Sequence, residues 1–155
     1  MILGHLDVHF SPTIVARVGD DTALWADALR DWFHRNDPDR IFGRDSPNSR
    51  TGTFTWSRHL HVVPSLEVAG KAALLKWEQT DNPFHRTSDR LLIYSLSQDA
   101  PLVHGLFLIA LLGDPGGHQR AFDGATAAGL RALWEDLAYS HQMVGALPSG
   151  ALTHR

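Results

Sequence analysis

The sequence predicts an α+β protein with a small, mainly antiparallel sheet, an N-terminal helix and a C-terminal helix. Two apolar runs rich in β-formers, at residues 91–96 and 106–112, are separated by a connection too short for a parallel crossover. Apolar residues also recur at helical spacing near the start of the chain and again from residue 123. The length of 155 residues favours one domain with one core.

The first third of the chain predicts a strand, a turn, a helix and a loop. Residues 2–10 alternate loosely and predict the strand, and Ser11 with Pro12 predicts the turn. A helix follows to about His34, and residues 41–53, rich in Gly, Ser, Pro, Asn and Arg, predict a loop. The helix has N-cap candidates at Asp20, Asp21 and Thr22 and a predicted apolar face of Leu24, Trp25, Ala28, Leu29, Trp32 and Phe33.

The middle of the chain carries weaker patterns. Residues 53–56 and 60–63 predict short strands, and residues 66–77 predict a helix that Gly70 weakens. Residues 80–88 form a polar connection that leads into the first of the two apolar strands.

The C-terminal region predicts one more helix and a tail. Residues 123–144 place Ala127, Leu130, Leu133, Trp134, Leu137 and Ala138 on one helical face. Residues 145–155 have no such pattern, so we expect a domain at residues 1–144 and a flexible tail at residues 145–155.

Composition limits the classes of protein that fit. The chain has no cysteine, which excludes disulfides and thiolate chemistry. It has neither the pattern of a signal peptide nor an apolar stretch of the ~18 residues that a membrane span needs, so we expect a cytoplasmic location and no membrane partner. The net charge is −3, but Lys and Arg outnumber Asp and Glu between residues 40 and 90.

Polar residues crowd the ends of the two apolar strands. Arg86, Asp89 and Arg90 precede the first strand, and His118 and Arg120 follow the second. If the strands are antiparallel neighbours, these residues meet at one edge of the sheet. Arginine binds phosphate through its planar fork, and histidine transfers protons near neutral pH. The sequence therefore predicts a site that handles a phosphodiester.

Four short motifs add a resemblance to a known family. Along the chain they are IFGRD from Ile41, FTW from Phe54, HLHV from His59 and RTSDRLLIYSL from Arg86, which is followed by an apolar strand and a Gly-rich turn into HQRAF. In this order they resemble the RelE-type ribonuclease toxins of bacterial toxin–antitoxin pairs, and in particular the YafO branch, over roughly residues 24–138. The resemblance implies a RelE-like fold and three partners: a cognate antitoxin protein, the ribosome and messenger RNA.

The implied activity is ribosome-dependent cleavage of messenger RNA without a metal or other cofactor. The 2′-hydroxyl of the substrate attacks the phosphate, and the enzyme must move protons and stabilise charge. His118 is the expected acid or base, and Arg86, Arg90 and Arg120 are the expected charge-stabilising groups. Strand alternation puts Tyr94 on the same face as Arg90, as a further catalytic candidate or as a core tyrosine.

Six other residues are candidates for contact with RNA or the ribosome. They are Arg44, Asp45, His59, His61, His85 and Thr87. His59 and His61 are two residues apart, so on a strand they face the same side, as metal ligands often do.

Two alternatives stay open on the sequence alone. One is a non-catalytic module of the same fold that binds the ribosome or the antitoxin. The other is a metal-dependent hydrolase that uses His59, His61 and His118.

Overall fold

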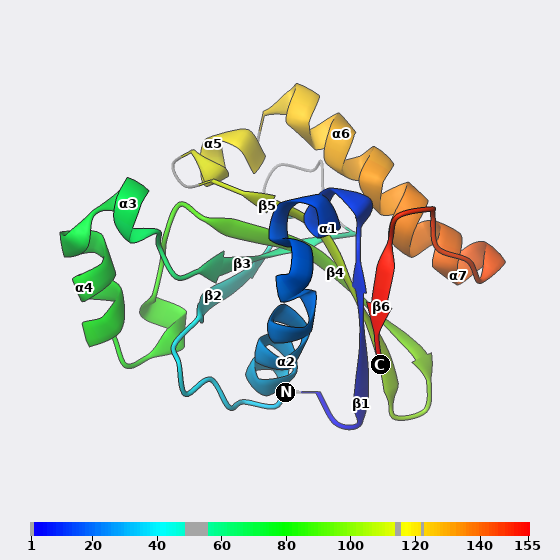
Figure 1. Cartoon of the computed structure of the whole chain (residues 1–155), viewed down its shortest axis with the longest axis horizontal. Coiled ribbons are helices and arrows are strands. Elements are labelled where there is room, and N and C mark those ends of the chain that lie inside the picture. Colours follow the sequence, from blue (N-terminus) through cyan, green and yellow to red (C-terminus); the bar gives the residue numbers. More distant parts are fainter. Residues whose placement is uncertain (1, 49–55, 114–115, 122) are drawn as a thin grey trace. The chain divides into compact units, whose positions relative to one another are not determined.

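The structure is a computed structural model that describes residues 2–48, 56–113, 116–121 and 123–155. It is α+β, and the strands of the described residues form one mostly antiparallel sheet in the order β2-β3-β4-β5-β1-β6 (Figure 1). The strands are β1 (His5–Phe10), β2 (Phe42–Pro47), β3 (Arg58–Val62), β4 (Leu91–Ala100), β5 (Val103–Leu112) and β6 (Leu152–His154). The helices are α1 (Pro12–Val18), α2 (Thr22–Phe33), α3 (Leu66–Ala69), α4 (Lys71–Gln79), α5 (Gly117–Ala121), α6 (Gly124–Trp134) and α7 (Ser140–Val144). The predicted fold class is confirmed.

Contacts within the chain define two compact units. The first contains Met1–Asn36, Tyr94–Ala110 and Ala128–Arg155, and the second contains Asp37–Ile93 and Leu111–Ala127. Each unit has its own fully buried side chains. They include Leu6, Phe10, Leu29, Tyr94 and Phe107 in the first unit and Phe42, Leu60, Leu91, Leu92 and Ile93 in the second.

The two apolar strands form a hairpin, as predicted, and both are longer than the sequence pattern indicated. β4 continues to Ala100 and β5 begins at Val103, so the connection is the pair Pro101 and Leu102. Leu102 adopts φ 59° there, a left-handed conformation that is uncommon outside glycine. The polar residues of the predicted connection extend the strands beyond the core.

In the first unit, β1 pairs in parallel with β5 and antiparallel with β6. The predicted turn at Ser11 and Pro12 is wrong, because these residues begin α1. Ser11 accepts a hydrogen bond from the Ile14 amide, and Pro12 fits the first helical position, where no amide donor is needed.

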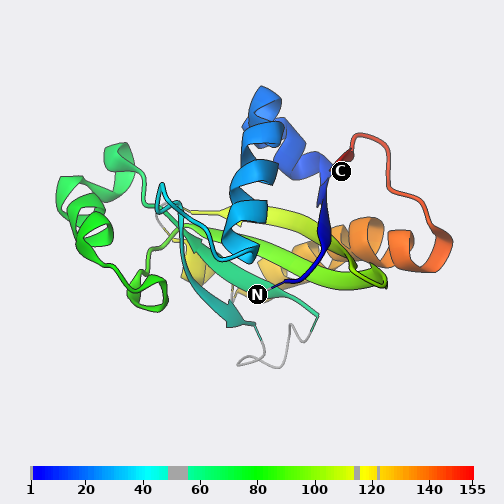
Figure 2. The same cartoon turned by 90° about the horizontal axis from the view of Figure 1, so that it is seen from below.

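Helix α2 lies with α1 on one side of the β4–β5 hairpin (Figure 2). Its buried residues are Thr22, Ala26 and Leu29, whereas Leu24 is 68% exposed. The buried face of α2 is therefore rotated relative to the predicted apolar face, and Leu29 is the one residue of that predicted face that is buried. Arg30 explains part of the difference, because its side chain turns toward the sheet and donates to the carbonyls of Leu6 at 3.0 Å and His154 at 2.7 Å.

The predicted flexible tail at residues 145–155 contains a strand, because Leu152–His154 form β6 against β1. Three residues are too few to show the alternation from which a strand is predicted. The division into a domain at residues 1–144 and a separate tail stays a prediction.

In the second unit, the predicted loop at residues 41–53 begins instead with strand β2, which pairs antiparallel with β3. A register shift between Phe42 and Asp45 interrupts the alternation that would have revealed the strand. The strand predicted at residues 53–56 lies outside the described residues except for Trp56.

The helix predicted at residues 66–77 is divided. Gly70, at φ 90°, separates α3 from α4, and the buried Trp77 anchors α4. The predicted C-terminal helix is confirmed as α6, a π-helical turn at Glu135–Tyr139 and α7, with Ala127, Leu130, Leu137 and Ala138 buried.

Candidate functional site

Three histidines meet in the second unit. His59 and His61 lie on β3, and His118 lies on α5, with ring centroids between 5.0 and 5.8 Å apart. One ring nitrogen from each lies within 4.8 Å of the other two. His59 and His61 are buried, whereas the side chain of His118 is 42% exposed. We call His59, His61 and His118 the histidine cluster.

Asp89 fixes the position of His118. Its carboxylate accepts hydrogen bonds from the backbone amides of Gly116 and His118 and lies 2.9 Å from Nδ1 of His118. Partial burial raises the pKa of Asp89, but the amide and imidazole hydrogen bonds outweigh it and lower the pKa below its ordinary value. Asp89 is therefore a carboxylate that orients the ring by accepting a hydrogen bond from its Nδ1.

The glycines before His118 have a packing reason. A Cβ on Gly113 or Gly117 would collide with the carbonyl oxygen of Asp89, and the Gly117 amide donates to that oxygen at 3.0 Å. Gly113, Gly116 and Gly117 thus lie directly against Asp89, and His118, the first residue of α5 with a side chain, reaches the cluster.

Each of the two buried rings also has a fixed partner at Nδ1. Nδ1 of His59 lies 2.6 Å from Oδ1 of Asn48, whose amide nitrogen donates to Oγ of Ser57. His59 must then be the donor, so Nε2 carries the lone pair of its neutral ring. Nδ1 of His61 lies 2.8 Å from both main-chain polar atoms of Ser88. At all three rings a fixed partner engages Nδ1 and so orients the ring.

The buried rings are neutral near pH 7. Burial, together with the neighbouring His61, His118, Arg44 and Arg58, lowers the pKa of His59 to about 4. Burial also lowers the pKa of His61 to about 4, with His118 acting in the same direction and a hydrogen bond to Ser88 opposing it. Arg44 therefore lies close enough to act on both rings electrostatically.

We expected Arg86 at an exposed strand end, but the residue is buried. It is 4% exposed, its Nη2 lies 3.9 Å from Oδ2 of Asp37, and its guanidinium carbon lies 5.8 Å from the ring centroid of Trp77. Burial lowers its pKa, and Asp37 opposes that shift. The carbonyl of Arg86 accepts from the Arg44 amide at 2.9 Å, so the RTSD and IFGRD motifs are joined through the main chain.

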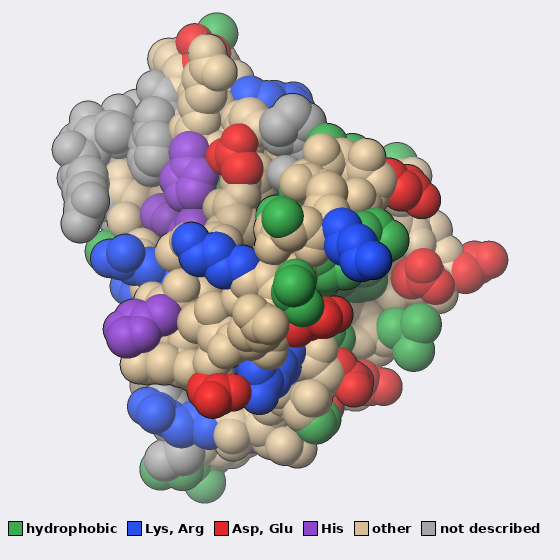
Figure 3. All heavy atoms as spheres, turned by 90° about the vertical axis from the view of Figure 1, so that its left-hand side faces the viewer, with side chains coloured by type: hydrophobic (Ala, Val, Ile, Leu, Met, Phe, Trp, Pro, Cys, Tyr) green, Lys and Arg blue, Asp and Glu red, His purple; other side chains and the backbone are tan. Residues whose placement is uncertain are grey.

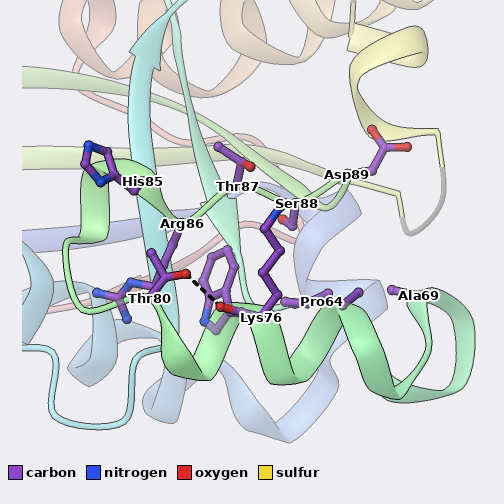
Figure 4. Close-up of a pocket in the computed structure, with 11 residues that line it drawn as sticks. Pro64, Ala69, Lys76, Thr80, His85, Arg86, Thr87, Ser88 and Asp89 are labelled. Atoms are coloured by element: carbon purple, nitrogen blue, oxygen red, sulfur yellow. Dashed lines mark hydrogen bonds between the residues drawn. The ribbon is translucent and has the colours of Figure 1, made fainter.

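A pocket of about 310 Å³ is lined by residues that include Arg86 and Asp89 (Figure 4). It lies between α4 and the segment that leads into β4. Asp89 is at the end nearest α5, and the exposed His85 is at the other. The pocket is lined by Pro64, Ala69, Ala73, Lys76, Trp77, Thr80, His85, Arg86, Thr87, Ser88 and Asp89.

The other predicted residues are spread over several environments. Arg120 is exposed on α5, two residues from His118, and Arg44 is exposed on β2. Arg90 is half-buried and donates to the Val63 carbonyl at 3.3 Å.

Tyr94 and Asp45 have mainly structural surroundings. Tyr94 is 1% exposed and makes an edge contact with Phe33, as expected of a core tyrosine. Asp45 pairs with Arg58 at 3.1 Å.

Sequence reasoning brought His118 to this edge and put His59 and His61 on one face, but it assigned no role to Asp89, Asn48 or Ser88. Asp89 was visible as the acid of the RTSD motif, whereas nothing in the sequence marked Asn48. Figure 3 shows histidine side chains grouped at the surface with acidic and Lys or Arg side chains beside them.

Comparison with known families defines the class of this protein. Residues 30–142 match the family model described as toxin YafO, type II toxin–antitoxin system, so the class is a toxin with an antitoxin partner. The chain belongs to the YafO toxin family. No curated protein and no solved structure gave a significant match. Among the described residues, no helix is long and apolar enough to cross a membrane.

Proposed function

We propose that this toxin is a cytoplasmic, ribosome-dependent endoribonuclease that cuts messenger RNA at the histidine cluster without a metal. The observation that carries the proposal is the convergence of three imidazoles whose Nδ1 atoms are all engaged by fixed partners. Such an arrangement fixes the orientation of each ring, and imidazole moves protons near neutral pH.

The cluster divides naturally into a base and an acid. His59 and His61 are neutral near pH 7, so either accepts the proton of the attacking 2′-hydroxyl. Nδ1 of His118 donates to the Asp89 carboxylate, and we assign His118 the role of the acid that protonates the departing 5′-oxygen. Attack by the 2′-hydroxyl forms the new phosphorus–oxygen bond, and the bond to the 5′-oxygen breaks.

Arg120 and Arg44 supply positive charge for the phosphate in this proposal. Arg120 extends from the same short helix as His118, and Arg44 acts on both buried rings. Three further residues near the pocket remain proposed RNA contacts: Arg90, His85 and Thr87. Burial makes Arg86 a positioning residue for β2 rather than a phosphate ligand.

The ribosome explains how a chain of net charge −3 acts on RNA, because it holds the messenger and the toxin needs only local positive charge. The family implies an antitoxin, and we propose that it covers the surface around the histidine cluster.

The test is primer extension on a message translated in vitro with the purified toxin, in buffer containing a chelator selective for Zn²⁺ that leaves Mg²⁺ for the ribosome. We expect cleavage by the wild type and a loss of ~10²–10⁴-fold for His118→Ala. His34→Gln, an exposed histidine in the other unit, is the matched control. Undiminished cleavage by His118→Ala would overturn the site, and translation arrest without new RNA ends would favour a non-catalytic toxin.

A second candidate function rests on the same geometry. Three imidazole nitrogens within 4.8 Å, with a carboxylate behind one of them, also fit a Zn²⁺ centre that activates water. Loss of cleavage by the wild type in chelator, restored by added Zn²⁺, would establish this metal-dependent hydrolase instead.

A further inference from the structure

We propose that His9, Asp99 and His141 form a binding site for one divalent transition-metal ion of the Zn²⁺ type. All three residues belong to the first unit and lie on β1, at the end of β4 and on α7. One ligand atom from each lies within 4.8 Å of the other two. Two histidines and one carboxylate are a donor set that such ions prefer. The proposal is independent of the function proposed for the histidine cluster.

His9 is the observation that calls for a ligand. It is 3% exposed, and its Nε2 has no hydrogen-bond partner among the described residues. Its Nδ1 lies 2.8 Å from Oγ1 of Thr153 on β6. When Nδ1 donates to that hydroxyl, the buried Nε2 presents a bare lone pair, which a metal ion satisfies and an apolar core does not.

Two neighbouring aromatic rings fix the position of the His9 ring. It stacks on Phe107 with centroids 4.6 Å apart, and it lies 4.8 Å from the ring of His141. Burial, followed by the neighbouring His141, lowers the pKa of His9 to about 4, so the ring is neutral at pH 7. Neutral imidazole is the form that binds a metal.

Asp99 and His141 already have the spacing of two ligands. Oδ2 of Asp99 lies 3.6 Å from Nε2 of His141, close to the roughly 3.3 Å that separates two donors on a tetrahedral ion with bonds near 2.0–2.1 Å. Oδ1 of Asp99 accepts from the Ser97 hydroxyl at 2.7 Å. That bond orients the carboxylate so that Oδ2 faces the histidine, as outer-shell partners of metal ligands do.

Gly105 makes room for the carboxylate. A Cβ at this position of β5 would lie 2.8 Å from Oδ2 of Asp99 and 3.0 Å from Oγ of Ser97. A hollow of about 620 Å³ opens beside the same residues, so an ion has access from solvent and an open coordination position. The hollow is lined by Leu96, Ser97, Gln98, Asp99, His141 and Gln142.

A bound ion would connect three elements of the first unit. It would join β1, the β4–β5 hairpin and α7, and through the His9–Thr153 hydrogen bond it would also strengthen the pairing of β6 with β1. An ion that binds the folded state alone raises the free energy of unfolding.

The test measures binding of Zn²⁺ and Co²⁺ to the full chain by calorimetry and by the visible absorption of Co²⁺. The measurements use a His118→Gln background, so that the histidine cluster lacks one ligand. We expect one equivalent to bind, and we expect Asp99→Asn and His141→Gln each to weaken binding by at least about tenfold. His5→Gln, which breaks an exposed His–Asp pair of the same unit, is the matched control and should bind normally.

A second measurement avoids substituting the buried His9. Zn²⁺ should shift the Nε2 resonance of His9 in the ¹⁵N spectrum of the His118→Gln chain and raise its Tm, with no rise after the further change His141→Gln. Absence of a bound equivalent in the His118→Gln chain, or unchanged binding in both Asp99→Asn and His141→Gln, would show an ordinary His141–Asp99 ion pair and overturn the proposal.

Discussion

At the scale of single residues, Asp89 connects the main chain to the chemistry. Its carboxylate accepts hydrogen bonds from the Gly116 and His118 amides, and it also orients the His118 ring. A neutral amide of the same shape keeps part of the hydrogen bonding but loses the carboxylate charge that strengthens the bond from Nδ1 of His118. Asp89 is thus the residue at which folding and the proposed catalysis are most closely linked.

We predict that Asp89→Asn lowers cleavage by roughly 10–100-fold while the chain stays folded, because the orienting carboxylate of a reactive histidine has effects of this size. Single-turnover cleavage on translating ribosomes measures the rate, and circular dichroism measures the fold. Asp45→Asn, which removes a carboxylate paired with Arg58, is the control. A fully active Asp89→Asn chain would separate Asp89 from the chemistry.

The buried histidines also make stability depend on pH. The pKa values of His59 and His61 are about 4 in the folded chain and near 6.5 when unfolded, so the unfolded state binds more protons between those values. Stability from these groups is therefore complete above pH 6.5 and is lost as the pH falls toward 4.

Changing both residues in His59→Gln/His61→Gln should flatten the dependence of Tm on pH between 6.5 and 4. Thermal unfolding at a series of pH values measures this, and His9, which has a similarly lowered pKa, supplies the slope that remains. An unchanged slope would mean that the two rings are already protonated in the folded state.

At the scale of elements, the segment from Arg86 to Arg90 organises its neighbours. Arg86 supports the loop at Asp37 and the start of β2, Ser88 contacts His61, and Asp89 positions α5. The motif that resembles the toxin family is therefore structural along much of its length, and its effect on the proposed site is largely indirect.

We predict that Arg86→Ala destabilises the chain by on the order of 3 kcal/mol, because it removes one partner of a buried ion pair. Urea denaturation measures the change, and Arg40→Ala, which removes a more exposed ion pair with Asp81, should cost far less. A chain with Arg86→Ala that is as stable as the wild type but inactive would restore the expectation that Arg86 acts on the phosphate.

Gly117 tests whether the Gly-rich segment positions His118. Gly117→Ala places a Cβ against the Asp89 carbonyl, so α5 must shift and His118 must leave the cluster. We expect a large loss of cleavage together with a changed His118 ring resonance. Gly129→Ala, at an α6 position with open space around its Cβ, should leave both unchanged. A normal His118 resonance in Gly117→Ala would refute this role.

At the scale of the whole molecule, sequence patterns predicted most of the fold and some of the residues that meet at the candidate site. Long apolar runs identified β4 and β5, and helical spacing identified α6 and α7. The helical spacing is visible because a helix that buries one face has apolar residues at regular intervals. β2 was missed because its bulge breaks the alternation, and β6 because three residues carry no pattern.

The candidate site shows the same division between local and long-range information. His59 and His61 share a face by strand alternation alone, and His118 followed from pairing the two apolar strands. The burial of Arg86 depends on Asp37 and Trp77, distant in sequence, so no local pattern predicts it. The hydrogen bond between Asn48 and His59 depends equally on a contact between strands.

The most direct test of the central claim is the chemistry of the cut ends. A messenger RNA is translated with the wild-type toxin in a Zn²⁺-selective chelator that leaves Mg²⁺ for the ribosome, alongside the same message with a single 2′-deoxynucleotide at the cleaved position. Attack by the 2′-hydroxyl predicts a 5′-hydroxyl end and a 2′,3′-cyclic phosphate, with no cleavage at the deoxy position. A 5′-phosphate end, or cleavage of the deoxy-substituted message, would contradict metal-independent catalysis at the histidine cluster.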